Sequence, residues 1–535
     1  MKKLVLGAAV SVALFGGAAQ AAITLDANGV PVINPADTYE IYLSGASAPQ
    51  PFIEALLTLG TIPSTAKVCD TTKAIYKFTD RTNGSNQTAY YCEMNTANTA
   101  LGALVSNGVK KNLLFYKRVA GGSGQGVAPI VANTAIDFLR LDTPANCTGL
   151  AGAPVIGALN VVPCNYNTAN PAETSKVIPD FGISDVDPLQ FRGDNKVSNL
   201  PEVTEADLAN LTVKAAAAQV FGIAVSTNLR NAMQQAQFGA TSLNVGKDTV
   251  AAMPSLTQEQ VSSLLTGRIT SWKQIKLSTT KNLFDASTAP YKASSDRVHI
   301  CRRTSGSGTQ AQVGIKFMGY PCSGTTGVGL PVPPSTDIPS PLAETVNQTQ
   351  VHAMSSAPNV GECLHELGMG TNDQPTNGFN NIYAGTTRWA IGFQGIDNNA
   401  SKAQEYRYIK INGFEPTLAM VALGKYIDWV ELTYQYNNSH AFDANELAII
   451  NELITQTGNP VVLAASNTAN STHDWGKSGF LATPQLHNPP ATGIVDVTKP
   501  VNPYSHGTNL TNTNNCRMPT YYPNAANAAA GIQYK

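Results

Sequence analysis

The chain has 535 residues, of which 13% are charged and 43% hydrophobic, and its formal net charge is −1. This length can bury two cores. A charge so close to zero argues against nucleic acid or an anionic membrane surface as a partner, so an anionic ligand would have to be held by local groups.

The first 21 residues have the pattern of a signal peptide. Lys2 and Lys3 precede an apolar run, and Ala19-Gln20-Ala21 offers a small-residue cleavage site. No later stretch reaches the roughly 20 apolar residues that a membrane span needs, and no cysteine follows the cleavage site to carry a lipid. Without Lys2 and Lys3, 33 basic residues remain against 36 acidic ones, a formal charge of −3, which argues further against nucleic acid or anionic membranes as partners. We therefore expect a periplasmic or secreted protein without a lipid anchor.

The eight cysteines are even in number, which in an exported protein favours disulfides over a metal site. None of the seven histidines has metal-ligand spacing, so we assign no metal and no cofactor. Spacing alone does not fix the connectivity. Pairing of near neighbours predicts the disulfides Cys69–Cys92, Cys147–Cys164, Cys301–Cys322 and Cys363–Cys516.

Two stretches of the chain have the order strand, Gly/Ser-rich turn, helix. The first has a strand at 39–43, a turn at 44–51 and a helix at 52–59; the second has a strand at 112–119, a turn at 120–126 and a helix-like segment at 127–139. Backbone N-H groups of such a turn and of the first helical turn converge on one point and can bind an anion. Residues 60–115 between them are interpreted as an insertion.

Two later stretches carry the charged candidates. A strand within 179–189 ends in Ser184-Asp185, and Arg302-Arg303 leads into a Ser/Gly run that opens a short helix ending near Gly319. A guanidinium can bind two oxygens of one anion at once. The alternative interpretation is structural: a flexible Ser/Gly loop, turn serines and a cap aspartate.

Taken in order, four segments resemble the ligand-contacting segments of the periplasmic phosphate-binding proteins of ABC importers. The Pro49-Gln50-Pro51 detail is most similar to the DING subgroup of that family, and the resemblance extends from about residue 40 to about residue 460. The four segments are Gly45-Ala46-Ser47-Ala48-Pro49-Gln50-Pro51, Gly122-Ser123-Gly124-Gln125-Gly126, Phe181-Gly182-Ile183-Ser184-Asp185 and Arg303-Thr304-Ser305-Gly306-Ser307-Gly308-Thr309.

The resemblance implies an α/β fold of the two-lobed type 2 periplasmic-binding-protein class. Each lobe would be a mixed sheet flanked by helices, with disulfide-bearing insertions, and the lobes would close on the ligand like a hinge. We expect lobe 1 at 38–217 plus 416–535 and lobe 2 at 218–415. The implied partners are inorganic phosphate and the membrane complex of an ABC importer, with no nucleic acid.

The resemblance also implies a role for each matching residue. Hydroxyls, backbone N-H groups and one arginine would bind the oxyanion, and one carboxylate would accept its proton, which disfavours fully deprotonated sulfate. Ser305 stands where the family usually has an acidic partner for the arginine, and Arg302 is interpreted as structural. The predicted ligand-binding residues are Ser47, Ala48, Ser123, Asp185, Arg303, Ser307, Gly308 and Thr309.

Two other functions stay open from the sequence. One is a DING-type extracellular phosphatase, although no activated nucleophile or metal cluster is visible. The other is a surface or structural protein that kept the fold. The polar, poorly periodic tail after residue 460, with Asn509–Asn515 and Tyr521–Tyr534, is predicted to wrap the surface or to pair with a partner.

Overall fold

The computed structural model describes residues 23–82, 84–108, 110–198, 200–322, 349–373, 379–490 and 494–522. The predicted signal peptide, residues 1–21, and the end of the predicted tail, residues 523–535, lie outside these ranges. Within them, no helix combines the length and the apolar character that a membrane crossing requires.

Most strands of the described ranges belong to one mixed sheet of 13 strands. Its main path runs β12-β11-β13-β9-β16-β8-β1-β4-β3-β2-β6, while β14 and β19 also pair with β9. These strands are β1 Thr38–Gly45, β2 Ile75–Asp80, β3 Gly84–Glu93, β4 Asn112–Arg118, β6 Leu159–Cys164, β8 Phe181–Ser184, β9 Leu211–Ser226, β11 His299–Arg303, β12 Gln350–Met354, β13 Ala390–Gly395, β14 Tyr406–Tyr408, β16 Trp429–Asn437 and β19 Phe480–Ala482.

The remaining strands of the described ranges form two-stranded pairs: β5 Ile136–Leu139 with β7 Thr174–Val177, β10 Ser255–Leu256 with β15 Lys410–Ile411, β17 Thr472–His473 with β18 Gly476–Lys477, and β20 Tyr504–Ser505 with β21 Thr520–Tyr521. The α-helices are α1 Gln50–Thr58, α2 Thr99–Asn107, α3 Ala128–Val131, α4 Glu205–Leu208, α5 Thr227–Phe238, α6 Gln258–Leu265, α7 Leu283–Ala286, α8 Gly308–Val313, α9 Ala357–Met369, α10 Leu418–Ala422, α11 Ala444–Thr457 and α12 Pro460–Asn470.

Strand β9 joins the two halves of the molecule. Its first part pairs with β16, and its second part, from Phe221 onward, pairs with β13. The run Ala215–Ala218 would suit a helix by propensity, but these small residues lie buried between two paired neighbours, and tertiary context overrides propensity. The predicted lobe boundary at 217/218 falls inside this strand.

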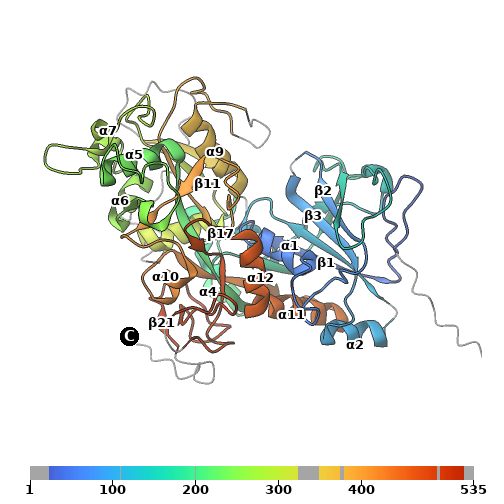
Figure 1. The fold of residues 1–535 in the computed structure, drawn as a ribbon. Helices are drawn as coiled ribbons and strands as arrows, with labels where there is room; N and C mark the ends of the chain where they lie inside the picture. The colour runs from blue at the N-terminus through green and yellow to red at the C-terminus, as the bar shows by residue number, and fades with distance from the viewer. Residues whose placement is uncertain are drawn as a thin grey trace, which may run out of the picture.

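Each half has its own hydrophobic core. One core holds Trp272, Trp389 and Ile391, and the other holds Phe52 and Phe115. Full burial of such side chains contributes about 1.5–3 kcal/mol each. Figure 1 shows the two halves, with α5, α6, α7 and α9 around one end of the sheet and β1, β2, β3 and α2 at the other. The predicted α/β class with two lobes is confirmed. The sheets expected in the two lobes are parts of one sheet, which continues through β9 and β16.

The predicted helix at 127–139 is wrong in its second half. The helix α3 stops at Val131, Asn133 has a left-handed backbone (φ 50), and Ile136–Leu139 is a strand paired with β7. A sharp turn at Asn133 therefore separates a short helix from a short strand, and the spacing of the apolar residues alone does not distinguish this arrangement from one helix. The other predicted elements at 39–43, 52–59 and 112–119 match β1, α1 and β4.

Two of the four predicted disulfides are correct. Cys69 pairs with Cys92 and Cys147 with Cys164, at separations of 23 and 17 residues. The other two are wrong: Cys301 pairs with Cys363, and Cys322 pairs with Cys516. The reason is three-dimensional packing, because α9 lies against β11 while the C-terminal segment passes over the end of the helical turn at Gly314–Met318.

The predicted tail is partly regular. Residues 460–470 form α12 rather than an irregular segment. The later part crosses the body of the protein, where Asn515 forms reciprocal hydrogen bonds with Asp187: Asn515 N to Asp187 Oδ2 is 2.8 Å and Asp187 N to Asn515 Oδ1 is 2.6 Å. The described tail therefore wraps the surface and is held there by Cys322–Cys516 as well.

Candidate functional site

The candidate residues lie where several strands end. Strands β1 and β8 are parallel neighbours, with Ser44 opposite Gly182, so their carboxyl ends lie at the same edge of the sheet. Ser47 follows β1 in the turn before α1, and Asp185 directly follows β8. Crevices outside the carboxyl ends of such strands are the usual ligand positions in open α/β sheets.

Arg303 is the last residue of β11 and is only 1% exposed. Its Nε donates to the carbonyl of Met354 (3.3 Å), its Nη2 to the carbonyl of Ser355 (2.8 Å), and its Nη1 to Ser47 Oγ (3.3 Å). Burial lowers its pKa to about 10, and the Asp185 carboxylate opposes this change. Two backbone carbonyls thus orient the guanidinium. Residue 305 is a serine and supplies no carboxylate for this purpose.

Asp185 is 2% exposed and faces the other half of the protein. Its Oδ2 accepts a hydrogen bond from Thr309 Oγ1 (3.1 Å), and its backbone N-H donates to Ser123 Oγ (3.2 Å). Among the described residues, its Oδ1 has no hydrogen-bond partner. Burial raises the pKa of Asp185, while Thr309 and Arg303 act in the opposite direction. The cap of the following 3-10 turn is Asp187, so Asp185 is not the cap aspartate.

Glycines let the two halves touch at this point. A Cβ on Gly308 would lie 2.2 Å from Ser123 Oγ and 2.9 Å from Asp185 Cβ. The backbone N-H of Gly124 donates to the carbonyl of Gly306 across the gap (2.7 Å). Only residues without a side chain allow such a close approach of two backbones.

The remaining two candidates lie beside this contact. Ser307 caps α8, where its Oγ accepts from the Gln310 backbone N-H at 3.3 Å. Ala48 packs in a small apolar cluster with Phe221 and Ala311. The structure thus brings all eight predicted residues to one region between the halves, and their roles in binding remain predictions.

Sequence reasoning missed two ionisable groups of this region. Lys117, on β4, is fully buried and its Nζ donates to the carbonyls of Gly45 (3.1 Å) and Ala46 (3.0 Å); burial lowers its pKa well below the usual value. The available signal was a lysine directly after the apolar run Leu113–Tyr116 of this strand.

Asp397 is the second missed group. It is 8% exposed, and neither of its carboxylate oxygens has a hydrogen-bond partner of normal geometry within the described ranges. Burial raises its pKa to about 7, and the Asp185 charge adds to this rise, while the Gln219 amide opposes it. Asp397 comes shortly after the end of strand β13, as Asp185 comes directly after the end of β8. An aspartate after the end of a strand is the sequence pattern that could have identified Asp397.

A cavity of about 380 Å³ leads from the surface to this region. Ser47 and Gln50 line it from one half, and Ser356 and Pro358 line it from the other. Ser47 also contacts Arg303, so the cavity ends one side chain away from the buried guanidinium. A ligand could therefore reach the arginine after a modest separation of the two halves.

No family model matches this chain, and no curated protein matches it. Solved structures give a weak likeness. An ABC-type phosphate transport receptor from Vibrio cholerae has 11% identity and a TM-score of 0.34, covering 78% of this chain and 93% of its own. The structure of PstS from Borrelia burgdorferi has 12% identity and a TM-score of 0.31, covering 80% and 96%. A DING protein has 12% identity and a TM-score of 0.38, covering 82% and 91%.

Proposed function

We propose that this protein is an exported solute-binding protein that holds inorganic phosphate, or a similar tetrahedral oxyanion, between its two halves. The observation that carries the proposal is the pairing of a buried guanidinium with an unsatisfied carboxylate oxygen. Among the described residues, Arg303 is buried with no carboxylate within ion-pair distance, and Asp185 Oδ1 lacks a donor in the same region.

Hydrogen phosphate would complement both groups. Its charged oxygens would accept from Arg303, Ser47 and Ser123, and its O-H would donate to Asp185 Oδ1, while the Thr309 hydroxyl keeps its hydrogen bond to Asp185 Oδ2. Placing an anion beside a buried cation offsets part of the cation's desolvation cost. Fully deprotonated sulfate has no proton for the carboxylate, so the site should disfavour it.

The binding cycle in this proposal uses the two halves as a hinged pair. Opening would break the Thr309–Asp185 and Gly124–Gly306 hydrogen bonds and bend the molecule at β9 and β16. The lobe boundaries 38–217 plus 416–535 and 218–415, the cleaved leader at 1–21 and delivery to an ABC importer remain parts of the proposal. The proposed function is ligand binding, and we propose no catalytic residue.

Calorimetric titration of the purified protein with phosphate, arsenate and sulfate tests the proposal. We expect saturable binding of one phosphate per chain, similar binding of arsenate and much weaker binding of sulfate. Absence of binding by all three would contradict the proposal and favour a structural role. Turnover of p-nitrophenyl phosphate that depends on Arg303 would favour the phosphatase alternative instead.

A further inference from the structure

A second cavity, of about 520 Å³, lies away from the candidate anion site. It is enclosed by the helical turn after α8, the loop that follows α10 and the tail segment 515–519. Its accessible wall includes the half-buried Tyr504 and the apolar side chains of Leu423 and Ile427, while Tyr426 and Trp429 border it with little exposed surface. Its size is in the range of sites that hold small organic molecules.

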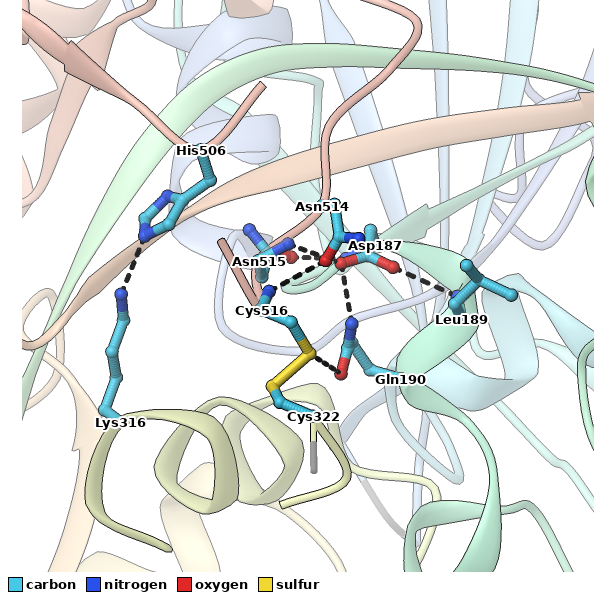
Figure 2. The surroundings of a disulfide bond; sticks show 9 residues. All are labelled: Asp187, Leu189, Gln190, Lys316, Cys322, His506, Asn514, Asn515 and Cys516. Carbon is cyan, nitrogen blue, oxygen red and sulfur yellow. Dashed lines mark hydrogen bonds between the residues drawn. A yellow bond between two sulfur atoms is a disulfide. The ribbon is translucent and has the colours of Figure 1, made fainter. Parts of the chain in front are cut away.

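One charged group stands at the inner end of this cavity. Lys316 Nζ lies 2.8 Å from His506 Nε2, and His506 Nδ1 lies 2.5 Å from Glu431 Oε2. Figure 2 shows the Lys316 side chain reaching from its helical turn to the His506 ring. The lysine therefore donates to the ring, and the ring donates to the carboxylate. Within the described residues, this uses one of the three N-H donors of Lys316 and leaves two for a ligand.

The charges of the cavity favour an anion. Its described lining includes two basic side chains, Lys316 and Arg517, and no acidic one. Burial lowers the pKa of Lys316 to about 8, and Glu431 and Asp428 behind it oppose this change. The ammonium also lies 5.5 Å from the centre of the Trp429 ring. A lysine with spare donors in a cavity that also has apolar side chains is suited to an acceptor group on an apolar body.

The tail wall of the cavity is firmly attached. The Cys322–Cys516 disulfide joins it to the end of the helical turn, and Asn515 is bound to Asp187 by the reciprocal hydrogen bonds described above. Figure 2 shows these two attachments side by side. A wall that is already fixed lowers the entropy cost of binding.

We propose that this cavity binds a small organic carboxylate with an aromatic or aliphatic body, whose carboxylate accepts hydrogen bonds from Lys316. The body packs against Tyr504, Leu423 and Ile427. An inorganic anion does not fit this chemistry, because the mostly apolar wall cannot replace its hydration shell. This site is independent of the proposed phosphate site.

The test uses two ligands that differ only in the polar end. Calorimetry of the full chain with 4-phenylbutyrate should show saturable binding, and with 4-phenylbutan-1-ol weaker binding. Lys316→Met keeps the length of the side chain and removes the charge, so it should weaken the carboxylate tenfold or more and change the alcohol less than threefold. Lys425→Met removes an exposed lysine beside the cavity that does not line it, and should leave both affinities unchanged.

Leu423→Trp provides a second variant, because Leu423 lines the cavity and is 38% exposed, so that the change should not disturb folding. The larger ring should obstruct the cavity and abolish binding of both ligands. The proposal is overturned by absent binding of 4-phenylbutyrate to the unaltered protein, by equal carboxylate affinity in a folded Lys316→Met variant, or by unchanged binding in Leu423→Trp.

Discussion

Asp185 and Glu431 are both buried carboxylates, but their surroundings differ. Glu431 Oε1 accepts from Ser505 Oγ and from the His506 backbone N-H, each at 2.8 Å, and its Oε2 accepts from the His506 ring. Among the described residues, the Asp185 carboxylate accepts a hydrogen bond from Thr309 on Oδ2, and its Oδ1 accepts none. Burial alone would raise the pKa of both, yet the pKa of Asp185 is raised while the pairing with His506 lowers that of Glu431 to about 2.

This difference separates a structural site from a candidate binding site. A buried polar group that is fully hydrogen-bonded stabilises one arrangement, as Glu431 does where the tail crosses β16. A buried group left unsatisfied costs free energy and persists at sites whose partner comes from outside. The predictions below test whether the two carboxylates really differ in this way.

The largest effect is expected from Glu431→Gln. The substitution removes a buried charge that accepts hydrogen bonds from Ser505 and His506, and a hydrogen bond to a charged group contributes about 1.5–3 kcal/mol. Chemical denaturation at pH 7 should therefore show a loss of this size. Asp142→Asn, at an exposed pair with Arg140, is the matched control and should change little.

Acid should remove the contribution of Glu431. Because its pKa is lower in the folded protein than in the unfolded chain, its stabilising effect is complete above about pH 4.5 and is lost as the pH falls toward about 2. The difference in stability between the unaltered protein and Glu431→Gln should shrink over that interval. A constant difference would mean that the charge of Glu431 is not what stabilises the tail.

A smaller effect is expected from Gly308→Ala at the contact between the halves. The added methyl group would lie 2.2 Å from Ser123 Oγ, so the two halves must separate slightly or strain. Overpacking of this kind costs about 1–3 kcal/mol. Gly60→Ala, where a Cβ meets nothing within 4 Å, should be nearly neutral. Equal stability and equal phosphate affinity in the two variants would show that the close contact is unimportant.

The smallest change in stability is expected from Asp185→Asn. Its raised pKa means that the ionised form destabilises the folded protein above the pKa of the unfolded chain, so removal of the charge should leave stability at pH 7 within about 1 kcal/mol or increase it. Calorimetry should also show that the preference for phosphate over sulfate falls about tenfold or more, since an acceptor becomes partly a donor. A loss as large as that of Glu431→Gln would make Asp185 a structural residue.

The sequence predicted the strands and turns that carry the candidate residues better than it predicted their neighbours in three dimensions. Short turns such as 44–51 and 120–126 contain glycines, and a glycine-rich turn depends on the local sequence. The positions of the strands and turns around Ser47 and Ser123 could therefore be predicted from the sequence. Lys117 and Asp397 join the same region only through sheet order, which places β4 beside β1 and β13 beside β11. No spacing rule contains that information.

The cysteines show the same limit. Cys69–Cys92 and Cys147–Cys164 connect neighbours within 23 residues, so proximity in sequence was sufficient. The Cys322–Cys516 bond spans 194 residues and depends on where the tail passes. Local pairing predicts the first kind of bond and fails for the second, because the second follows from the folded arrangement.

The central claim is that Arg303 is the cation that binds the oxyanion. Phosphate titration of Arg303→Lys and Arg302→Lys tests it most directly, because the two arginines are adjacent and point to opposite faces of β11, and Arg303 donates to Ser47. Lysine cannot reproduce the bidentate fork, so Arg303→Lys should weaken binding about tenfold or more while Arg302→Lys leaves it nearly unchanged. Equal affinities in the two variants, or a larger loss in Arg302→Lys, would contradict the account.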